Sequence, residues 1–276
     1  MTIKVLISGS GKMGREVLHA VSAEDDMEPV GVVDLLSTEE YISLPGEGEV
    51  LVPFERDPAA LITRTRPDVI VDFTSAEWTP KLAEAALQDN VRLVSGTSGL
   101  SERFLSHLGE ECSKRELGAV VAANFAIGAI LMQQMSRMAA RFYDNAEIIE
   151  QHHDGKADAP SGTSLATAKA IVDAHGKPMS VTATKRETIQ GTRGGVVDGV
   201  AIHSVRLPGL VAHQEVIFGG PGETLRIRHD TSDRASFMPG VLLAVREVMN
   251  LKSLVVGLEG LFGFESEGTR QRADAG

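Results

Sequence analysis

Residues 3–14 read IKVLISGSGKMG, and this stretch decides the fold. Its first six residues form an apolar, largely β-branched run that is typical of a buried strand, and glycines then interrupt it. A helix is predicted next, over residues 15–23, with apolar side chains on one face. The segment Gly9-Ser10-Gly11-Lys12-Met13-Gly14 therefore matches G-x-G-x-x-G in the context that the pattern needs, between a strand and a helix.

This glycine segment predicts a dinucleotide site. Its glycines allow a tight turn and let the backbone approach a pyrophosphate at the helix N-terminus. Asp34 ends a second predicted strand, residues 30–34, where a carboxylate would bind the ribose hydroxyls and repel a 2′-phosphate. Two leucines follow, so we expect NADH to be favoured, with NADPH tolerated through Lys12. The alternative is a purely structural turn with a polar residue at the strand end.

Strand-like runs alternate with helical stretches through the first half of the chain. Strands are predicted at residues 69–73, 91–95 and 118–123, and a helix at 77–88. This alternation predicts a parallel sheet with helices on both faces. The loops Asp72-Phe73-Thr74 and Gly96-Thr97-Ser98-Gly99 follow two of these strands, where such sheets bind ligands, although ordinary turn chemistry would produce them equally well.

The pattern changes after about Asn124. Helices are predicted at residues 127–142 and 161–174, and strands at 146–151, 200–206, 215–218 and 223–228. Successive strands with few helices favour an antiparallel α+β domain. A helix at 234–249 and a strand at 253–256 could rejoin the first domain. We therefore expect a discontinuous dinucleotide-binding domain, residues 1–123 and 234–276, and a second domain, residues 124–233.

Composition narrows the function classes. The net charge of −11 over 276 residues argues against nucleic acid as a partner, because binding phosphates needs a basic face. No apolar run is long enough to cross a membrane. The single cysteine, Cys112, cannot form an internal disulfide, which suits a reducing cytoplasm, and we interpret it as a packing residue.

Residues 150–163, EQHHDGKADAPSGT, carry the chemistry-bearing side chains. His152 can donate or accept a proton near neutral pH, and Lys156 can hold an anion or act as an acid. Gly155 and Pro160 predict a loop that leads into a helix starting at Ser161, whose N-terminal amides attract carboxylates or phosphates. The natural guest is an anionic small molecule that must be protonated. The alternative is a solvated polar loop.

Other polar residues of the second domain carry less weight. His203, His213 and Arg193 are interpreted as sheet-surface or subunit-contact residues. Adjacent histidines have the wrong spacing to share a metal ion from a strand, and no third ligand is evident, so no metal is expected.

These segments resemble the dihydrodipicolinate reductase family over nearly the whole chain. The resemblance rests above all on the pattern E-x-H-H-x-x-K-x-D-A-P-S-G-T at residues 150–163. It extends to GKMG at 11–14, DFT at 72–74, GTSG at 96–99, AANF at 122–125, HSVRLPG at 203–209 and EVIFG at 215–219.

The resemblance implies an α/β fold: a Rossmann-type dinucleotide-binding domain and an α+β substrate domain whose open mixed sheet assembles a homotetramer. It implies NAD(P)H-dependent reduction of 4-hydroxy-tetrahydrodipicolinate, a cyclic dicarboxylate, to tetrahydrodipicolinate in the diaminopimelate route of lysine biosynthesis. His152 and Lys156 would carry the proton chemistry, and His153, Gly162 and Thr163 would bind the substrate carboxylates. The cofactor would contact Ser8, Gly9, Ser10, Gly11, Lys12, Met13, Gly14, Asp34, Thr74, Gly96, Thr97, Ser98, Ala122, Ala123, Asn124 and Phe125.

Two other functions stay open at this point. One is a different two-domain NAD(P)-dependent amino-acid dehydrogenase, against which the compact His-His-Lys loop argues. The other is a dinucleotide-sensing protein without turnover, against which an intact set of proton donors argues.

Overall fold

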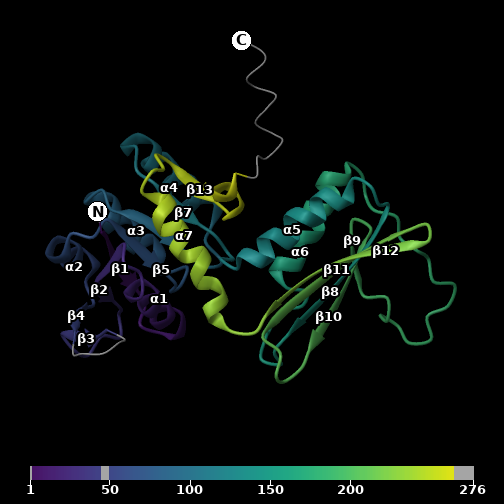
Figure 1. Ribbon diagram of the computed structural model, residues 1–276, viewed down its shortest axis with the longest axis horizontal. Coiled ribbons are helices and arrows are strands. Elements are labelled where there is room, and N and C mark those ends of the chain that lie inside the picture. Colours follow the sequence, from purple (N-terminus) through teal and green to yellow (C-terminus); the bar gives the residue numbers. More distant parts are fainter. Residues whose placement is uncertain (1, 45–49, 264–276) are drawn as a thin grey trace, which may run out of the picture. The chain divides into compact units, whose positions relative to one another are not determined.

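The computed structural model describes residues 2–44 and 50–263. It divides into two compact units, the first formed by Met1–Phe125 with Phe237–Gly276 and the second by Ala126–Ser236 (Figure 1). Among the described residues, no helix is both long and apolar enough to span a bilayer.

The first unit is built on an eight-stranded sheet with the order β13-β7-β6-β5-β1-β2-β4-β3. Its strands are β1 (Ile3–Ser8), β2 (Met27–Val33), β3 (Tyr41–Ser43), β4 (Leu51–Glu55), β5 (Val69–Asp72), β6 (Arg92–Ser95), β7 (Ala119–Val121) and β13 (Leu254–Val256). Every pairing is parallel except that of β3 with β4. The chain order reverses between β1 and β5, and ligands of open α/β sheets bind at the carboxyl ends of strands at such a switch point.

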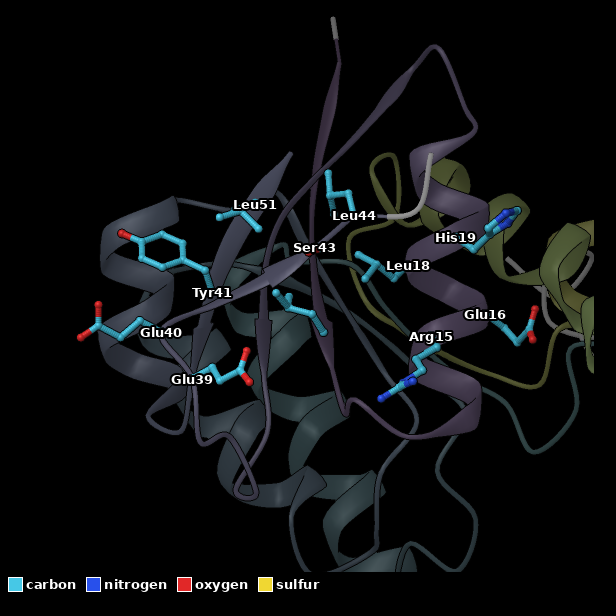
Figure 2. Close-up of a pocket in the computed structure, with 11 residues that line it drawn as sticks. Arg15, Glu16, Leu18, His19, Glu39, Glu40, Tyr41, Ser43, Leu44 and Leu51 are labelled. Atoms are coloured by element: carbon cyan, nitrogen blue, oxygen red, sulfur yellow. The ribbon is translucent and has the colours of Figure 1, made fainter. Parts of the chain in front are cut away.

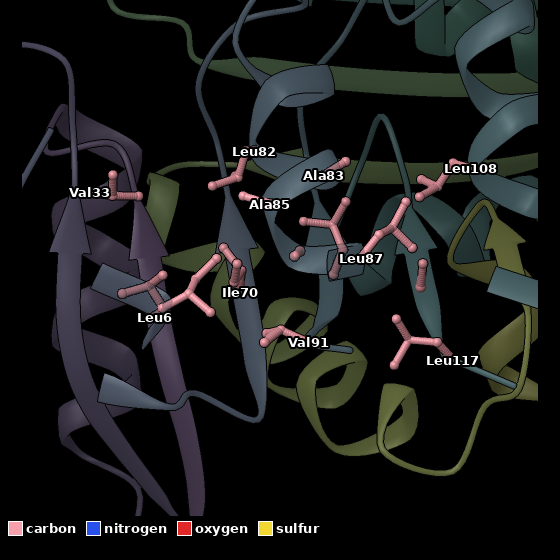
Figure 3. Packing of buried hydrophobic residues seen from close by; sticks show 14 of the residues in the cluster. Leu6, Val33, Ile70, Leu82, Ala83, Ala85, Leu87, Val91, Leu108 and Leu117 are labelled. Atoms are coloured by element: carbon pink, nitrogen blue, oxygen red, sulfur yellow. The ribbon is translucent and has the colours of Figure 1, made fainter. Parts of the chain in front are cut away.

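Helices cover this sheet because each presents one apolar face. They are α1 (Lys12–Ser22), α2 (Pro58–Thr65), α3 (Thr79–Gln88), α4 (Glu102–Arg115) and α7 (Met238–Val248), with the short 3₁₀ turn η2 (Glu259–Phe262). A second 3₁₀ turn, η1 (Arg234–Phe237), precedes α7 where the chain leaves the second unit. Side chains of α3, such as Leu82, pack with Leu6 of β1 and Ile70 of β5 in one buried cluster (Figure 3). The predicted parallel α/β fold of this part of the chain is confirmed.

Several elements of the first unit differ from the sequence prediction. The strands β3 and β4 and the helices α2 and α4 were not predicted, because they are short or mostly polar. Helix α1 begins at Lys12, three residues earlier than predicted, since Gly11 already takes the extended conformation of an N-cap. The single helix predicted at 234–249 is a 3₁₀ turn followed by α7, and a proline lies in the first turn of α7, where its missing N–H is harmless.

The second unit has a five-stranded sheet with the order β12-β11-β8-β10-β9. Its elements are α5 (Ile127–Ala140), β8 (Asn145–His152), α6 (Gly162–His175), β9 (Gly195–Val197), β10 (Val200–Arg206), β11 (Ala212–Gly220) and β12 (Glu223–Thr231). Both helices lie along one face of the sheet (Figure 1), where Ile148 packs with Met132 and Ile171. The open mixed sheet that the family resemblance implies is confirmed: β8 and β10 are parallel because α6 forms a crossover between them, and the other pairings are antiparallel.

Candidate active site

The glycine segment lies at the carboxyl end of β1 and forms the turn into α1. Gly9 has a φ of +98°, which a residue with a side chain rarely adopts. A Cβ on Gly14 would lie 1.8 Å from the carbonyl oxygen of Gly9, so only glycine allows the helix to start this close to the turn. Gly11 is exposed and has no neighbour within 4 Å of its Cβ position. An open backbone at a helix N-terminus fits a dinucleotide pyrophosphate.

Asp34 follows β2 directly and holds this turn. Its Oδ2 accepts hydrogen bonds from the Ser10 amide and hydroxyl, both at 2.7 Å, and its Oδ1 accepts one from the Leu36 amide at 2.9 Å. Partial burial opposes ionisation, but these hydrogen bonds outweigh it and lower the pKa of Asp34. The carboxylate is therefore charged at neutral pH, beside the turn where the adenosine end of a dinucleotide would lie.

A second buried carboxylate organises the loops after β5 and β6. Asp72 has no exposed surface and accepts hydrogen bonds from four hydroxyls: Thr74 at 2.6 Å, Thr79 at 2.6 Å, Ser95 at 3.1 Å and Thr97 at 3.0 Å. Thr97 in turn accepts from the Thr74 amide at 3.2 Å. The predicted cofactor residues Thr74 and Thr97 are thus joined, while Ser98 lies exposed beyond them.

Aromatic contacts set the shape of this edge. A Cβ on Gly96 would lie 2.0 Å from the ring of Phe73, which in turn packs against Phe125 with ring centroids 5.4 Å apart. Of the segment at 122–125, Ala122 and Phe125 are buried, and Ala123 is exposed. Ser8 differs from the other predicted cofactor residues, because its fully buried hydroxyl accepts from Trp78 Nε1 at 3.0 Å and faces the protein interior.

A cavity in the first unit lies elsewhere. It has a volume of about 1040 Å³ and is lined by Arg15, Leu18 and His19 of α1 and by residues 39–44 and 51 around β3 (Figure 2). None of the predicted site residues lines it.

In the second unit, His152 is the last residue of β8, at the carboxyl end of the strand. Its Nδ1 lies 2.5 Å from Oε2 of Glu150, whose side chain is fully buried two residues earlier on the same face. Arg206 of β10 pairs in register with His152 and binds Glu150 through Nη1 at 3.0 Å and Nη2 at 2.8 Å. Sequence reasoning missed Glu150 and Arg206. The i, i+2 spacing of Glu150 and His152 on a predicted strand indicates that the two side chains lie on the same face, and it could have linked them.

The protonation states of this cluster follow from its contacts. Burial raises the pKa of Glu150, but Arg206 and the other hydrogen-bond donors outweigh it, so the pKa is lowered and the group is ionised. Burial lowers the pKa of His152 more than Glu150 raises it. The imidazole is therefore mostly neutral at pH 7.

The loop after β8 carries the remaining predicted residues. Lys156 Nζ donates to Asp158 Oδ1 at 2.7 Å, and its side chain is 22% exposed. His153 is exposed and lies over Gly155, where a Cβ would be 3.3 Å from its Nδ1.

The loop ends at the N-terminus of α6. Ser161 caps the helix and accepts the amide of Ser164 at 3.2 Å, while Gly162 and Thr163 are exposed in the first turn. The geometry of a helix start leaves the amides of these two residues for a ligand. The structure thus places His152, His153, Lys156, Gly162 and Thr163 on one strand end, one loop and one helix start.

The other polar residues of this unit lie on the sheet face opposite the helices. His203 Nε2 bonds Glu147 at 2.9 Å, Arg193 binds the same carboxylate, and His213 Nδ1 bonds Asp230 at 2.8 Å. They are hydrogen-bonded polar groups on that face of the sheet. No His, Cys, Asp or Glu cluster that could hold a metal is present in the described part of the chain.

Family profiles match both halves of the chain. The profile described as "Dihydrodipicolinate reductase, N-terminus" matches residues 3–125, and the profile described as "Dihydrodipicolinate reductase, C-terminus" matches residues 128–262. The 4-hydroxy-tetrahydrodipicolinate reductase of Gloeobacter violaceus is 49% identical over 94% of this chain and 99% of its own. That of Geobacillus thermodenitrificans is 46% identical over 94% of this chain and 98% of its own.

Solved structures agree with the sequence matches. The dipicolinate-bound dihydrodipicolinate reductase of Paenisporosarcina sp. TG-14 superposes with a TM-score of 0.85 and 41% identity, covering 94% of this chain and 99% of that one. An amine dehydrogenase of Mycobacterium smegmatis shares the fold at a TM-score of 0.65 and 12% identity, over 94% of this chain and 96% of its own.

Proposed function

The chain belongs to the dihydrodipicolinate reductase family and reduces 4-hydroxy-tetrahydrodipicolinate with NAD(P)H in lysine biosynthesis, and we propose that residues 152–163 bind and protonate its substrate. One observation carries the proposal. A histidine, a lysine and an open helix N-terminus come from a single strand–loop–helix segment of the second unit.

The reaction needs one hydride and one proton. Loss of water from the substrate gives a conjugated imine, and reduction of that imine gives an enamine that must be protonated on carbon. The reduced nicotinamide supplies the hydride. Lys156 is the preferred proton donor and His152 its partner or substitute, because both are partly exposed at the end of the sheet. A cation there also stabilises the negative charge that develops during hydride arrival.

Alanine variants test the proton donors. His152→Ala and Lys156→Ala are each expected to lower kcat by roughly 100-fold, a typical size for losing a general acid, with little change in NADH affinity. The assay couples the synthase that makes the substrate to this enzyme and follows NADH absorbance. Lys177→Ala is the matched control, since Lys177 also pairs with an aspartate, Asp144, at 3.7 Å on the surface of the same unit. Near-normal turnover in both His152 and Lys156 variants removes the assignment.

The amides at the start of α6, together with His153, are proposed to hold the substrate carboxylates. Binding of a cyclic dicarboxylate fits the similarity to the relative from Paenisporosarcina, whose structure contains dipicolinate. Gly162→Pro removes one amide while keeping a residue that helices favour at this position. We expect KM to rise by about 10- to 100-fold from the loss of one charge-assisted hydrogen bond. Gly162→Ala keeps the amide and controls for the added Cβ. An unchanged KM in Gly162→Pro contradicts the role.

The first unit is proposed to bind the cofactor, with NADH favoured over NADPH. The ionised Asp34 supports this preference, because a carboxylate accepts from a ribose 2′-hydroxyl and repels a 2′-phosphate. Asp34→Asn keeps an acceptor for Ser10 and removes the charge. It should therefore bring the Kd values for NADPH and NADH closer together. If the substitution changes both Kd values by the same factor, Asp34 does not discriminate between the 2′-hydroxyl of NADH and the 2′-phosphate of NADPH.

A homotetramer assembled through the open sheet face of the second unit is proposed for the same enzyme. Half-buried Ile149 and Ile217 lie on that face beside its ion pairs. Sedimentation of the enzyme at micromolar concentration measures the assembly, and a fully active monomer contradicts it.

A reducing cytoplasmic setting is proposed for the enzyme, because it suits the buried, unpaired Cys112.

A further inference from the structure

Glu150 is a buried charge to which the proposed reaction has so far given no role. Its side chain has no exposed surface, so it cannot contact the substrate. It nevertheless binds two nitrogens of Arg206, Nδ1 of His152 and the Ser204 side chain. Burying a charge this deeply costs folding free energy unless the charge is fully paired, and these partners offset that cost.

The first consequence concerns the tautomer of His152. An ionised carboxylate only accepts hydrogen bonds, so the hydrogen between Glu150 and His152 must be carried by Nδ1. The neutral ring then has its free lone pair on Nε2. Proton exchange with any ligand or solvent therefore takes place at Nε2, and the ring cannot turn over without losing its bond to Glu150.

The second consequence concerns the loop. Arg206 Nη2, which binds Glu150, also donates to the backbone oxygen of Asp158 at 2.7 Å. Asp158 is the partner of Lys156. One guanidinium therefore joins the buried carboxylate beneath the histidine to the segment that holds the lysine.

The charges around the imidazole explain why the carboxylate is needed. Arg206 from β10 and Lys156 from the loop both disfavour a second positive charge on His152. Glu150 opposes them, and Asp158 lies farther out on the loop, paired with Lys156. The facing residue of β11, Ala212, is uncharged. Without Glu150 the ring would be surrounded by two cations in a partly buried site, and its protonated form would be scarce near neutral pH.

We propose that Glu150 and Arg206 are a positioning pair for the proton chemistry: Glu150 fixes His152 as the Nδ1–H tautomer, and Arg206 fixes the loop that carries Lys156. The inference rests on the proposed role of these two residues in protonation. Neither member of the pair touches the substrate in this scheme.

The pH profile of kcat/KM tests the role of Glu150. Glu150→Gln is nearly isosteric and removes the negative charge, so the imidazolium loses its stabilisation. The limb of the pH profile that follows the titration of His152 should move to lower pH by about one unit, the usual effect of one nearby charge. The value of kcat should fall by about 10-fold or more, with a smaller change in KM. Asp144→Asn, which neutralises a surface carboxylate beside His175 at the other end of β8, controls for charge alone.

The role of Arg206 has its own variant. Arg206→Lys keeps a cation for Glu150 but cannot reach both the carboxylate and the Asp158 carbonyl. We expect kcat to fall by about 10-fold while the His152 limb of the pH profile stays in place, because Glu150 remains ionised. This variant also keeps the test open if Glu150→Gln fails to fold.

Nitrogen NMR of ¹⁵N-histidine-labelled enzyme gives a readout that does not depend on activity. The His152 signals, identified by their loss in His152→Gln, should show Nδ1–H at high pH in the wild type and a mixture of tautomers in Glu150→Gln. An Nε2–H tautomer in the wild type, or an unshifted pH profile in Glu150→Gln, overturns the positioning pair. Full activity of His152→Gln instead overturns the proposed protonation role, whatever tautomer NMR finds, so the two failures are distinguishable.

Discussion

Gly14→Ala is expected to damage both the stability of the first unit and its affinity for NADH. The added Cβ would lie 1.8 Å from the Gly9 carbonyl oxygen, whereas real contacts of this kind are not shorter than 3.0 Å, so the two must separate by at least 1.2 Å. Gly9 cannot retreat easily. Its amide donates to the carbonyl oxygen of Val33 at 2.8 Å, which holds the turn against β2. The start of α1 must move instead.

The magnitude follows from this displacement. Helix α1 is anchored by the buried side chains of Val17, Leu18 and Val21, so a backbone collision at its first turn should cost about 2–4 kcal/mol of unfolding free energy. Amides that move by more than 1 Å lose their alignment with a pyrophosphate. Losing one or two charge-assisted hydrogen bonds should raise the Kd for NADH by roughly 100-fold.

The single tryptophan provides the assay. Trp78 is buried and donates to Ser8 at the end of β1, so its emission reports unfolding of the first unit, and NADH titration gives the Kd. Gly11→Ala is the matched control: its Cβ meets no protein atom within 4 Å, and an alanine N-cap costs only about 1 kcal/mol. Gly11→Ala should therefore lose at most about 1 kcal/mol of unfolding free energy. It should still lose NADH affinity, because its Cβ would lie on the open backbone that is proposed to face the pyrophosphate. A Gly14→Ala protein that unfolds and binds NADH like the wild type refutes the reasoning.

Three further predictions concern buried titratable groups. Asp72→Ala removes the shared acceptor of four hydroxyls and should lower the unfolding free energy seen by Trp78 by about 3 kcal/mol, whereas Asp72→Asn should cost about half, because hydroxyls can rotate to donate or accept. Burial lowers the pKa of His152 and of His229, so the unfolded chain binds more protons than the folded chain near pH 6. The unfolding free energy of the second unit should therefore fall as the pH drops from 7 to 5. In denaturant titrations, His229→Gln should make this dependence of the unfolding free energy on pH less steep. Burial raises the pKa of Cys112 to about 11, so a thiol reagent at pH 8 should label it only after unfolding.

Local sequence patterns were sufficient for much of the fold and for the glycine turn. Continuous apolar runs such as Val69–Asp72 can be recognised because parallel strands are buried on both faces. The missed helix α4 shows the limit, since only Leu108 and Cys112 are buried among its 14 residues and its apolar face is narrow. The parallel pairing of β8 with β10 could have been predicted from the helix between them.

The candidate site was predictable only where its residues are neighbours in the chain. His152, Lys156 and the α6 N-terminus fall within one short segment, so their proximity needs no tertiary information. Arg206 is 56 residues from Glu150, and only the register of β10 beside β8 brings them together. Buried pairs of this kind leave no periodic signal, because each residue alone fits an ordinary polar strand position.

The two buried carboxylates show how each unit fixes its own loops. Asp72 and Glu150 both lie at or near the carboxyl end of a strand and have no exposed surface. Asp72 is satisfied by four hydroxyls, which carry no charge, whereas Glu150 binds a guanidinium and an imidazole besides the Ser204 side chain. The hydroxyls hold the loops after β5 and β6 without adding charge to them. The carboxylate of Glu150 and the guanidinium of Arg206 bias the protonation of the His152 ring, as the proton chemistry proposed for the second unit requires.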